Sequence, residues 1–435
     1  MTTTTASLIG TGSEQPALTA LPKTGSSSSL ASLLSSEHDA STSSTLCEPM
    51  EKSINDGDCL GCGMHSREIA FVDLEPTELN ICSALGERDS RTIECLRING
   101  CRMDSSALSL LVEELCHLEL LNLHTIDFSK NQLSGSLAGK SLAKLLGNAP
   151  LVRTLSLGWN NLSLGDLRDL SQSSLANVAF LDLRSNPLLV PTRKSSAKCT
   201  SKKASSRRSS VTIEDNGSDN NDDMAWLYAL VESMPALTHV LLAQASIADK
   251  ALIVLLDALT RPGTSIEYIG LEWLSLGSRL ASLSAIFKNI VSSRQNFTSS
   301  TLHLNLAANN LGDSGIDVIA SSGATMASLT LACNFITEKG TAMLAKWLPK
   351  SGLTSLDLSD NHFGDQGIAS LVSIHSDIML DAHYTQIRSL GLNSCCLSDA
   401  SLRTVSDALS YNWAPLESLR ILRNNRMSSC AKISM

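Results

Sequence analysis

Two stretches of the sequence decide the fold: residues 152–162, VRTLSLGWNNL, and residues 353–363, LTSLDLSDNHF. Both follow the template L-x-x-L-x-L-x-x-N-x-L, whose positions we number 1 to 11. Good copies also cover 178–188 and 326–336, and weaker copies begin at residues 93, 123, 237, 266, 301, 387 and 416. Self-similarity of this kind indicates a stack of supersecondary units. The sequence therefore contains about eleven repeats.

The spacing of the repeats is regular. Position 9 falls at residues 101, 131, 160, 186, 245, 274, 309, 334, 361, 395 and 424, so most repeats are 25 to 30 residues long. The one spacing of 59 residues contains a segment, 190–223, in which a basic run precedes an acidic cluster. Because the repeat resumes after it, we interpret 190–223 as a disordered insertion on one repeat rather than a domain boundary.

Each repeat has a strand half and a helix half. In L-x-L, alternate side chains point to opposite faces, so the leucines enter the interior and their neighbours face out. Apolar residues then recur at three- and four-residue spacing, as at Ile368, Leu371 and Val372, which predicts a helix. Alternating strands and helices predict a parallel sheet, and the greater width of helices bends the stack with its sheet on the concave side.

The paired leucines, with asparagine at position 9 in seven copies, resemble the leucine-rich repeat family. The glycine-aspartate segments 312–315 (GDSG) and 364–367 (GDQG) are similar to the ribonuclease-inhibitor-like subclass. The resemblance implies an α/β fold, a right-handed horseshoe-shaped solenoid with a parallel concave sheet and helices on the convex side. We expect a disordered Ser/Thr-rich tail at 1–46, an N-terminal cap or linker at 47–91 and the repeat domain at 92–435.

The asparagine at position 9 is predicted to bond backbone groups of its own turn and of the neighbouring coil, which gives a ladder of amides. Cys101 and Cys395 replace asparagine in two copies, and Ala245 and Leu274 replace it in two others. Because alanine and leucine cannot make these bonds, we expect an irregular seam where Ala245 and Leu274 stand, beside the insertion.

Large aromatic and charged residues gather on the predicted concave face of the middle repeats. Aromatic anchors flanked by charges are typical of protein-binding hot spots. We therefore predict a partner-binding patch, with packing of these rings against their neighbours or beneath the insertion as the alternative. The patch comprises Trp159, Phe180, Asp182, Arg184, His239, Tyr268, Glu272, Trp273 and His303.

Two further motifs lie outside the repeats. Cys47, Cys59, Cys62 and His65 have the side-chain types that hold tetrahedral zinc, although their spacing matches no zinc family over its whole length, and ordinary cap or linker cysteines are the alternative. In the insertion, two arginines and a spacer precede Ser210, a pattern similar to the substrates of basophilic kinases. A passive solvated loop is the alternative there, and we predict no cofactor.

Composition narrows the class of function. A formal charge of −9 does not favour nucleic acid, and no apolar run is long enough to span a membrane. Twelve irregularly spaced cysteines suit a reducing compartment, so we expect a cytoplasmic protein, with the nucleus as a second compartment. No nucleophile elbow, zinc-protease motif or phosphate-binding glycine loop is present.

These observations favour a non-enzymatic scaffold or regulatory adaptor that binds another protein on its concave face. The alternative comes from the resemblance. Ran GTPase-activating proteins use similar repeats, which implies stimulation of GTP hydrolysis by a small GTPase. Those proteins carry an acidic stretch after the repeats, whereas this sequence ends in residues 423–435, RNNRMSSCAKISM, and no residue here matches their GTPase-contacting positions securely.

Overall fold

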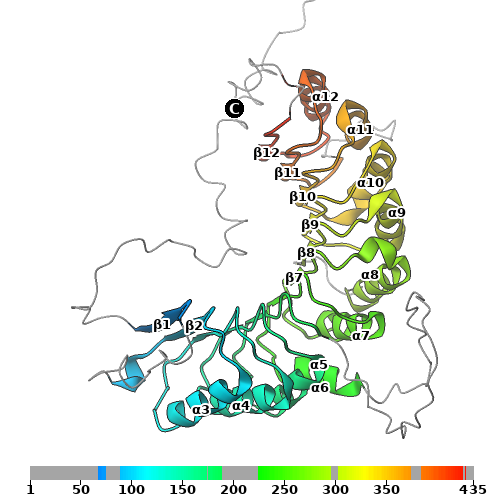
Figure 1. Ribbon diagram of the computed structural model, residues 1–435. Coiled ribbons are helices and arrows are strands. Elements are labelled where there is room, and N and C mark those ends of the chain that lie inside the picture. The colour runs from blue at the N-terminus through cyan, green and yellow to red at the C-terminus, as the bar shows by residue number, and fades with distance from the viewer. Residues whose placement is uncertain are drawn as a thin grey trace, which may run out of the picture.

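The computed structural model describes residues 67–74, 89–173, 175–188, 224–294, 302–373, 384–424 and 427. Within them, all strands belong to one parallel sheet of twelve strands in the order β1 to β12. Figure 1 shows a curved array with the sheet on its inner side and the helices on its outer side. The predicted α/β solenoid is therefore confirmed.

The strands are mostly three residues long and the helices are of variable length. The strands are β1 (Glu68–Val72), β2 (Cys95–Asn99), β3 (Thr125–Asp127), β4 (Thr154–Ser156), β5 (Phe180–Asp182), β6 (His239–Leu241), β7 (Tyr268–Gly270), β8 (His303–Asn305), β9 (Ser328–Thr330), β10 (Ser355–Asp357), β11 (Ser389–Gly391) and β12 (Ser418–Arg420). The α-helices are α3 (Ser105–Leu115), α4 (Gly135–Asn148), α5 (Leu164–Leu167), α6 (Ala225–Glu232), α7 (Asp249–Thr260), α8 (Leu280–Arg294), α9 (Gly312–Ser322), α10 (Glu338–Ser351), α11 (Gly364–Leu371) and α12 (Asp399–Ser410). Short 3-10 turns cover Ser90–Thr92, Arg168–Gln172 and Leu276–Ser278.

The described sheet has one more strand than the eleven repeats counted in the sequence. The additional strand is β1, which pairs with β2 in parallel from Glu68 to Val72. Ile69 and Phe71 occupy positions 4 and 6 and are buried. β1 was not recognised from the template because positions 1, 9 and 11 hold Ser66, Leu74 and Pro76. Within the described residues the sheet thus begins at β1, inside the segment that we expected to be a cap or linker.

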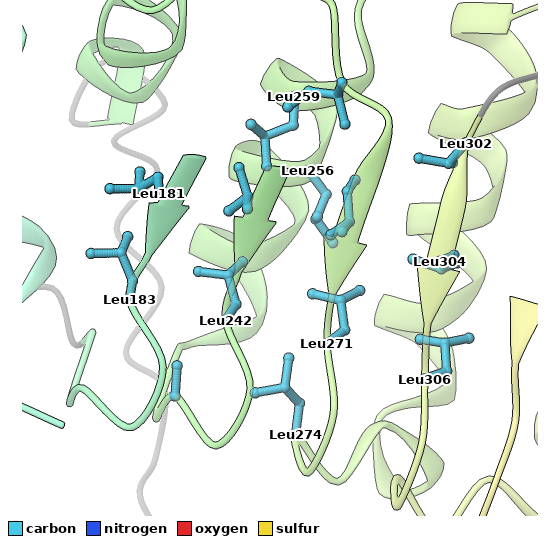
Figure 2. Packing of buried hydrophobic residues seen from close by; sticks show 14 of the residues in the cluster. Leu181, Leu183, Leu242, Leu256, Leu259, Leu271, Leu274, Leu302, Leu304 and Leu306 are labelled. Atoms are coloured by element: carbon cyan, nitrogen blue, oxygen red, sulfur yellow. The ribbon is translucent and has the colours of Figure 1, made fainter. Parts of the chain in front are cut away.

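The residues at positions 4 and 6 of every strand are buried, as the template predicts. Figure 2 shows the leucines of neighbouring strands, among them Leu242, Leu271 and Leu304, projecting into the same interior. Leu256 and Leu259 of α7 approach that layer from the helical side. Each buried leucine contributes about 1.5–3 kcal/mol relative to an exposed one, so this layer holds sheet and helices together.

The predicted asparagine ladder is confirmed. Asn160 shows the pattern: its Nδ2 donates to the carbonyl of Phe128 on the preceding coil (2.9 Å) and to that of Leu157 in its own turn (3.0 Å), and its Oδ1 accepts from the N–H of Leu133 (3.1 Å). All asparagines at position 9 bond the preceding coil in this way: Asn131, Asn160, Asn186, Asn309, Asn334, Asn361 and Asn424. Each amide satisfies backbone groups that would otherwise be buried without partners.

The two cysteines at position 9 reproduce part of the ladder. The Sγ of Cys395 donates to the carbonyls of Leu358 and Asn393, both at 3.3 Å, and Cys101 does the same with Phe71 and Asn99. Burial raises the pKa of the Cys395 thiol to about 12. The thiol therefore stays protonated and serves as a hydrogen-bond donor rather than a nucleophile.

The ladder is interrupted between Asn186 and Asn309. Ala245 and Leu274 are buried at position 9 and have no side-chain donor. Leu274 lies in the turn below β7, among the side chains of the interior (Figure 2). Strand pairing nevertheless continues in register from β5 to β8. The seam therefore affects the turn bonds and leaves the sheet intact.

Position 8 has a backbone conformation that the template did not reveal. Every residue there has a positive φ, although only Gly100 is a glycine. The N–H of each position-8 residue, up to the coil of β11, donates to the carbonyl at position 7 of the next coil, as Trp159 does to Arg184 at 2.7 Å. A left-handed conformation costs a non-glycine residue about 1–2 kcal/mol, so the neighbouring coil holds this turn in place. The residues are Asp73, Gly100, Lys130, Trp159, Ser185, Gln244, Trp273, Ala308, Cys333, Asp360, Ser394 and Arg423.

Candidate binding surface on the concave sheet

Four predicted site residues lie side by side on the concave sheet. Phe180, His239, Tyr268 and His303 occupy position 3 of β5, β6, β7 and β8 and are paired in register. The ring centroids of Phe180 and His239 are 6.1 Å apart, and those of His239 and Tyr268 are 5.8 Å apart, with interplanar angles of 29° and 15°. The register of the sheet therefore builds a row of stacked rings. His303 continues the row and is exposed.

The two imidazoles of this row are neutral near pH 7. Burial lowers the pKa of His239 below its ordinary value of 6.5, and the carboxylate of Glu267 opposes the shift. Partial burial of its ring lowers the pKa of His303 as well, with the neighbouring imidazole of His239 adding to the shift and Glu267 again opposing it. The row is thus an uncharged aromatic surface at neutral pH.

A fixed cation lies at the edge of this row. Arg184 forks onto the carboxylate of Asp182, with Nε–Oδ1 at 3.0 Å and Nη2–Oδ2 at 2.9 Å. Asp182 is only 3% exposed, so the pair is largely shielded from water. The guanidinium carbon lies 4.7 Å from the ring centroid of Trp159, a cation–π contact. Trp159, Asp182 and Arg184 therefore form one preassembled unit.

Glu272 lies over β7, in the middle of the surface. Its Oε1 accepts from Nδ2 of Asn305 at 2.6 Å, and the same Nδ2 is 3.2 Å from the hydroxyl of Tyr268. Its Oε2 is buried and has no hydrogen-bond partner. Burial raises the pKa of Glu272, while Arg184 partly opposes the shift. Gly270 makes room for the carboxylate, because a Cβ there would lie 2.9 Å from Oε2.

Trp273 is the most exposed aromatic of the predicted set, at 60% against 39% for Trp159. Both tryptophans occupy position 8 at the carboxyl ends of their strands. All nine predicted residues thus belong to β4–β8 and the turns that follow. Asn305 and Gly270 belong to the same surface but were missed. Both are at position 5, between the paired leucines. Comparison of the position-5 residues of all repeats would have found them.

Packing of the rings against their neighbours is the alternative to partner binding, and part of this packing is present. Phe180, His239 and Tyr268 are half-buried against one another, whereas Trp273 and His303 are exposed. The stack crosses from β5 to β7, the same two coil boundaries at which Ala245 and Leu274 leave the ladder incomplete. The rings therefore contribute to the fold as well as to the surface.

The rest of the concave face has a different character. Near the N-terminal end, Arg97 on β2 bridges Glu68 on β1 (2.8 Å) and Asp127 on β3 (3.4 Å). Beyond β8, position 3 of β9, β10, β11 and β12 is serine in every strand. Ion pairs within the sheet and short hydroxyl side chains offer no large apolar anchor. Aromatic and imidazole rings at position 3 are therefore confined to β5, β6, β7 and β8 among the described strands.

Several predictions concern residues outside the described part of the chain. They include the tail at 1–46, the zinc candidates Cys47, Cys59, Cys62 and His65, the insertion at 190–223 and Ser210 within it. Among the residues that the structure does describe, no group of three or more His, Cys, Asp or Glu side chains could hold a metal ion. In the same residues no helix has the length and apolarity needed to cross a bilayer.

Comparison with known proteins agrees with this architecture. The family model described as "Leucine Rich repeat" matches residues 298–320 and 353–372. Ribonuclease inhibitor from Sus scrofa is 28% identical over 193 residues, which cover 41% of this chain and 41% of that protein. The human NACHT, LRR and PYD domains-containing protein 14 is 28% identical over 180 residues, 40% of this chain and 16% of that protein. The chain spans less than half the length of these curated relatives.

Among solved structures, an internalin (inlF) from Listeria monocytogenes aligns with 71% of this chain and 80% of its own, at 16% identity and a TM-score of 0.31. The repeats, the amide ladder and the family match define the chain as a leucine-rich repeat protein. Its repeat length and its likeness to ribonuclease inhibitor assign it to the ribonuclease-inhibitor-like subclass. Repeats of this kind generally serve as protein-interaction scaffolds, through the extended concave surface that their curvature creates.

Proposed function

We propose that this protein is a non-enzymatic interaction scaffold or regulatory adaptor. Its partner is another protein, bound on the concave surface formed by the nine predicted residues together with Asn305 and Gly270, which we name the aromatic surface. The observation that carries the proposal is the preassembly of its rings and charges. The stacked row, the Trp159–Arg184–Asp182 unit and the exposed Trp273 all lie within five adjacent strands.

The mechanism is recognition by a rigid surface. Side chains that are already held by stacking and by forked hydrogen bonds lose little conformational entropy when a partner binds. Trp159, Phe180, Tyr268 and Trp273 are the apolar anchors, and the carboxylates and Arg184 select the charges of the partner. This role needs no cofactor and no catalytic group.

Site-specific photocross-linking tests this function. A photoreactive amino acid at position 303 should capture a partner in cells, and the paired substitution Trp159→Ala with Trp273→Ala should remove most of the cross-linked product. Tyr411, 74% exposed just after α12, provides the control, because Tyr411→Ala should leave capture unchanged. Undiminished capture by the folded double variant would exclude the aromatic surface as the binding site.

The GTPase-activating alternative stays a prediction. No feature of the aromatic surface favours GTP hydrolysis specifically, and a single-turnover assay with a GTP-loaded Ran-like GTPase tests it directly. We keep the cytoplasm as the expected compartment, with the nucleus as the second one.

A further inference from the structure

Internal repetition allows one turn of the solenoid to be compared with another. Trp159 and Trp273 both occupy position 8, both have a positive φ, and both donate their backbone N–H to the position-7 carbonyl of the next coil. That carbonyl belongs to Arg184 for Trp159 (2.7 Å) and to Ala307 for Trp273 (3.2 Å). The two tryptophans are therefore equivalent in backbone placement, and what differs is the side chain that follows.

At the first turn, the position-7 side chain covers the indole. The Arg184 guanidinium lies over the Trp159 ring and is held there by a buried carboxylate, Asp182. At the second turn, Ala307 has only a methyl group in the equivalent place, and Trp273 remains 60% exposed. The solenoid thus presents the same tryptophan platform twice, with its own cation over only one of them.

A carboxyl group accompanies the uncovered tryptophan. Glu272 precedes Trp273 in the chain, its Oε1 accepts from Asn305, and its Oε2 is buried without a hydrogen-bond partner. Asn305 occupies position 5 of its coil, as Asp182 does beside Arg184. The second turn therefore has an aromatic face and a carboxyl group, which Glu272 provides because position 5 holds Asn305. Position 7 provides a guanidinium in the first turn and only a methyl group in the second.

We infer that Trp273 and Glu272 form a receptor for an arginine side chain of the bound partner. The inference rests on the proposed function and adds the chemistry of the partner: an arginine presented to the turn after β7, stacked on Trp273 as Arg184 stacks on Trp159. Arginine fits better than lysine, because a planar guanidinium can stack on the indole and bond a carboxylate at the same time. The protein's formal charge of −9 also favours a basic segment.

The first experiment supplies the arginine within the chain. Ala307→Arg places a guanidinium where the first turn has one, and Ala307→Gln is the uncharged control. We expect the arginine variant to have a folding equilibrium constant about threefold or more above that of the glutamine variant, in line with measured cation–π contacts. The gain should disappear when Trp273→Leu or Glu272→Gln is added. Equal stability of the arginine and glutamine variants would overturn the inference.

The second experiment does not depend on tolerance of the Ala307 substitution. An oligo-arginine peptide and the citrulline peptide of the same length are titrated into the wild-type chain, and the indole N–H signals are followed by NMR. We expect the arginine peptide alone to shift the signal of Trp273, with a smaller shift for Trp159, whose face is already covered. A response of Trp273 to both peptides, or to neither, would contradict the receptor.

The third experiment connects the receptor to the partner. If the partner provides the arginine, Ala307→Arg should reduce cross-linking from position 303 at least threefold relative to Ala307→Gln. Unchanged cross-linking would show that the partner binds the aromatic surface without using this receptor. The proposed function would then stand and the inference would fail, so the two failures are distinguishable.

Discussion

Arg420 on β12 donates from Nη2 to Oδ2 of Asp357 on β10 at 3.1 Å, so this ion pair crosses the intervening strand β11. The contact is possible because β11 has a glycine at position 5. A Cβ on Gly391 would lie 2.4 Å from Oδ1 of Asp357 and 3.2 Å from Nη2 of Arg420. The missing side chain thus allows two charges on alternate strands to meet.

The first prediction follows from this contact. Gly391→Ala should displace Asp357 and lower the free energy of unfolding by about 0.5–1 kcal/mol, the value of a partly exposed ion pair plus minor strain. Gly147→Ala is the matched control. It lies in α4 with open space around it and should stabilise by about 0.4–1 kcal/mol. Urea denaturation of both variants tests the pair, and a stabilising Gly391→Ala would refute it.

The second prediction concerns the amide ladder. Asn361 is fully buried, donates to the carbonyls of Leu331 and Leu358, and accepts from the N–H groups of Asn334 and Ile336. Asn361→Ala should therefore cost about 3 kcal/mol or more, because several buried groups lose their partners. Asn361→Cys should recover part of the loss, since a thiol donates in this place at Cys395. Equal losses for the two variants would show that the hydrogen-bond donor is unimportant.

The third prediction uses the left-handed turns. Ala308 has a φ of 55°, whereas its neighbour Ala307 is not in this region. Ala307→Gly should lose about 0.5–1 kcal/mol through backbone entropy, and Ala308→Gly should be neutral or stabilising, because glycine removes the steric cost of a positive φ. Thermal unfolding of the two variants should differ in that order, and the reverse order would contradict the backbone assignment.

The fourth prediction concerns pH. Burial raises the pKa of Glu272 above its ordinary value of 4.5, so the folded chain holds its proton more tightly than the unfolded chain does. The stability associated with this proton is present below pH 4.5 and is lost as the pH rises through the raised pKa. Glu272→Gln, which mimics the protonated acid, should remove that decline. Denaturation of wild type and variant at several pH values from 4 to 8 measures this. If the free energy of unfolding depended on pH in the same way for both proteins, the raised pKa would be contradicted.

The fifth prediction tests the row of rings as part of the fold. His239 stacks on Phe180 and on Tyr268, so His239→Ala should lose about 1–2 kcal/mol through two aromatic contacts. His362→Ala, at an exposed position after β10, is the control and should change stability by less than about 0.5 kcal/mol. A loss no larger than the control's would mean that the stack contributes only to the surface.

The repeated part of the structure could be predicted from sequence because the same residue pattern recurs in every repeat. The buried leucines, the parallel sheet and the asparagine bonds follow from a template with a fixed period. β1 could not be found in this way, because Ser66, Leu74 and Pro76 stand at positions 1, 9 and 11 and leave only positions 4 and 6 matching the template. The left-handed position 8 was equally hidden, since eleven of its twelve residues are not glycine and the neighbouring coil, not the residue type, imposes the conformation.

The candidate site could be placed but not detailed. Alternation within the strands predicts that Phe180, His239 and Tyr268 share a face, and the parallel register makes them neighbours. The fork of Arg184 onto Asp182 depends on side-chain rotamers, and the bond from Asn305 to Glu272 depends on which coils become adjacent. These two contacts depend on the assembled stack and cannot be predicted from the local sequence.

The gap in the ladder has a consequence for how the array loses its structure. In a linear stack each coil is stabilised by its neighbours, so a weakened boundary divides cooperativity. Ala245 and Leu274 remove the amide from the β5–β6 and β6–β7 boundaries, and the stacked rings cross those two boundaries. We therefore expect the N-terminal and C-terminal arms to melt in separate steps, and a partner bound across β4 to β8 to couple them into a single cooperative unit.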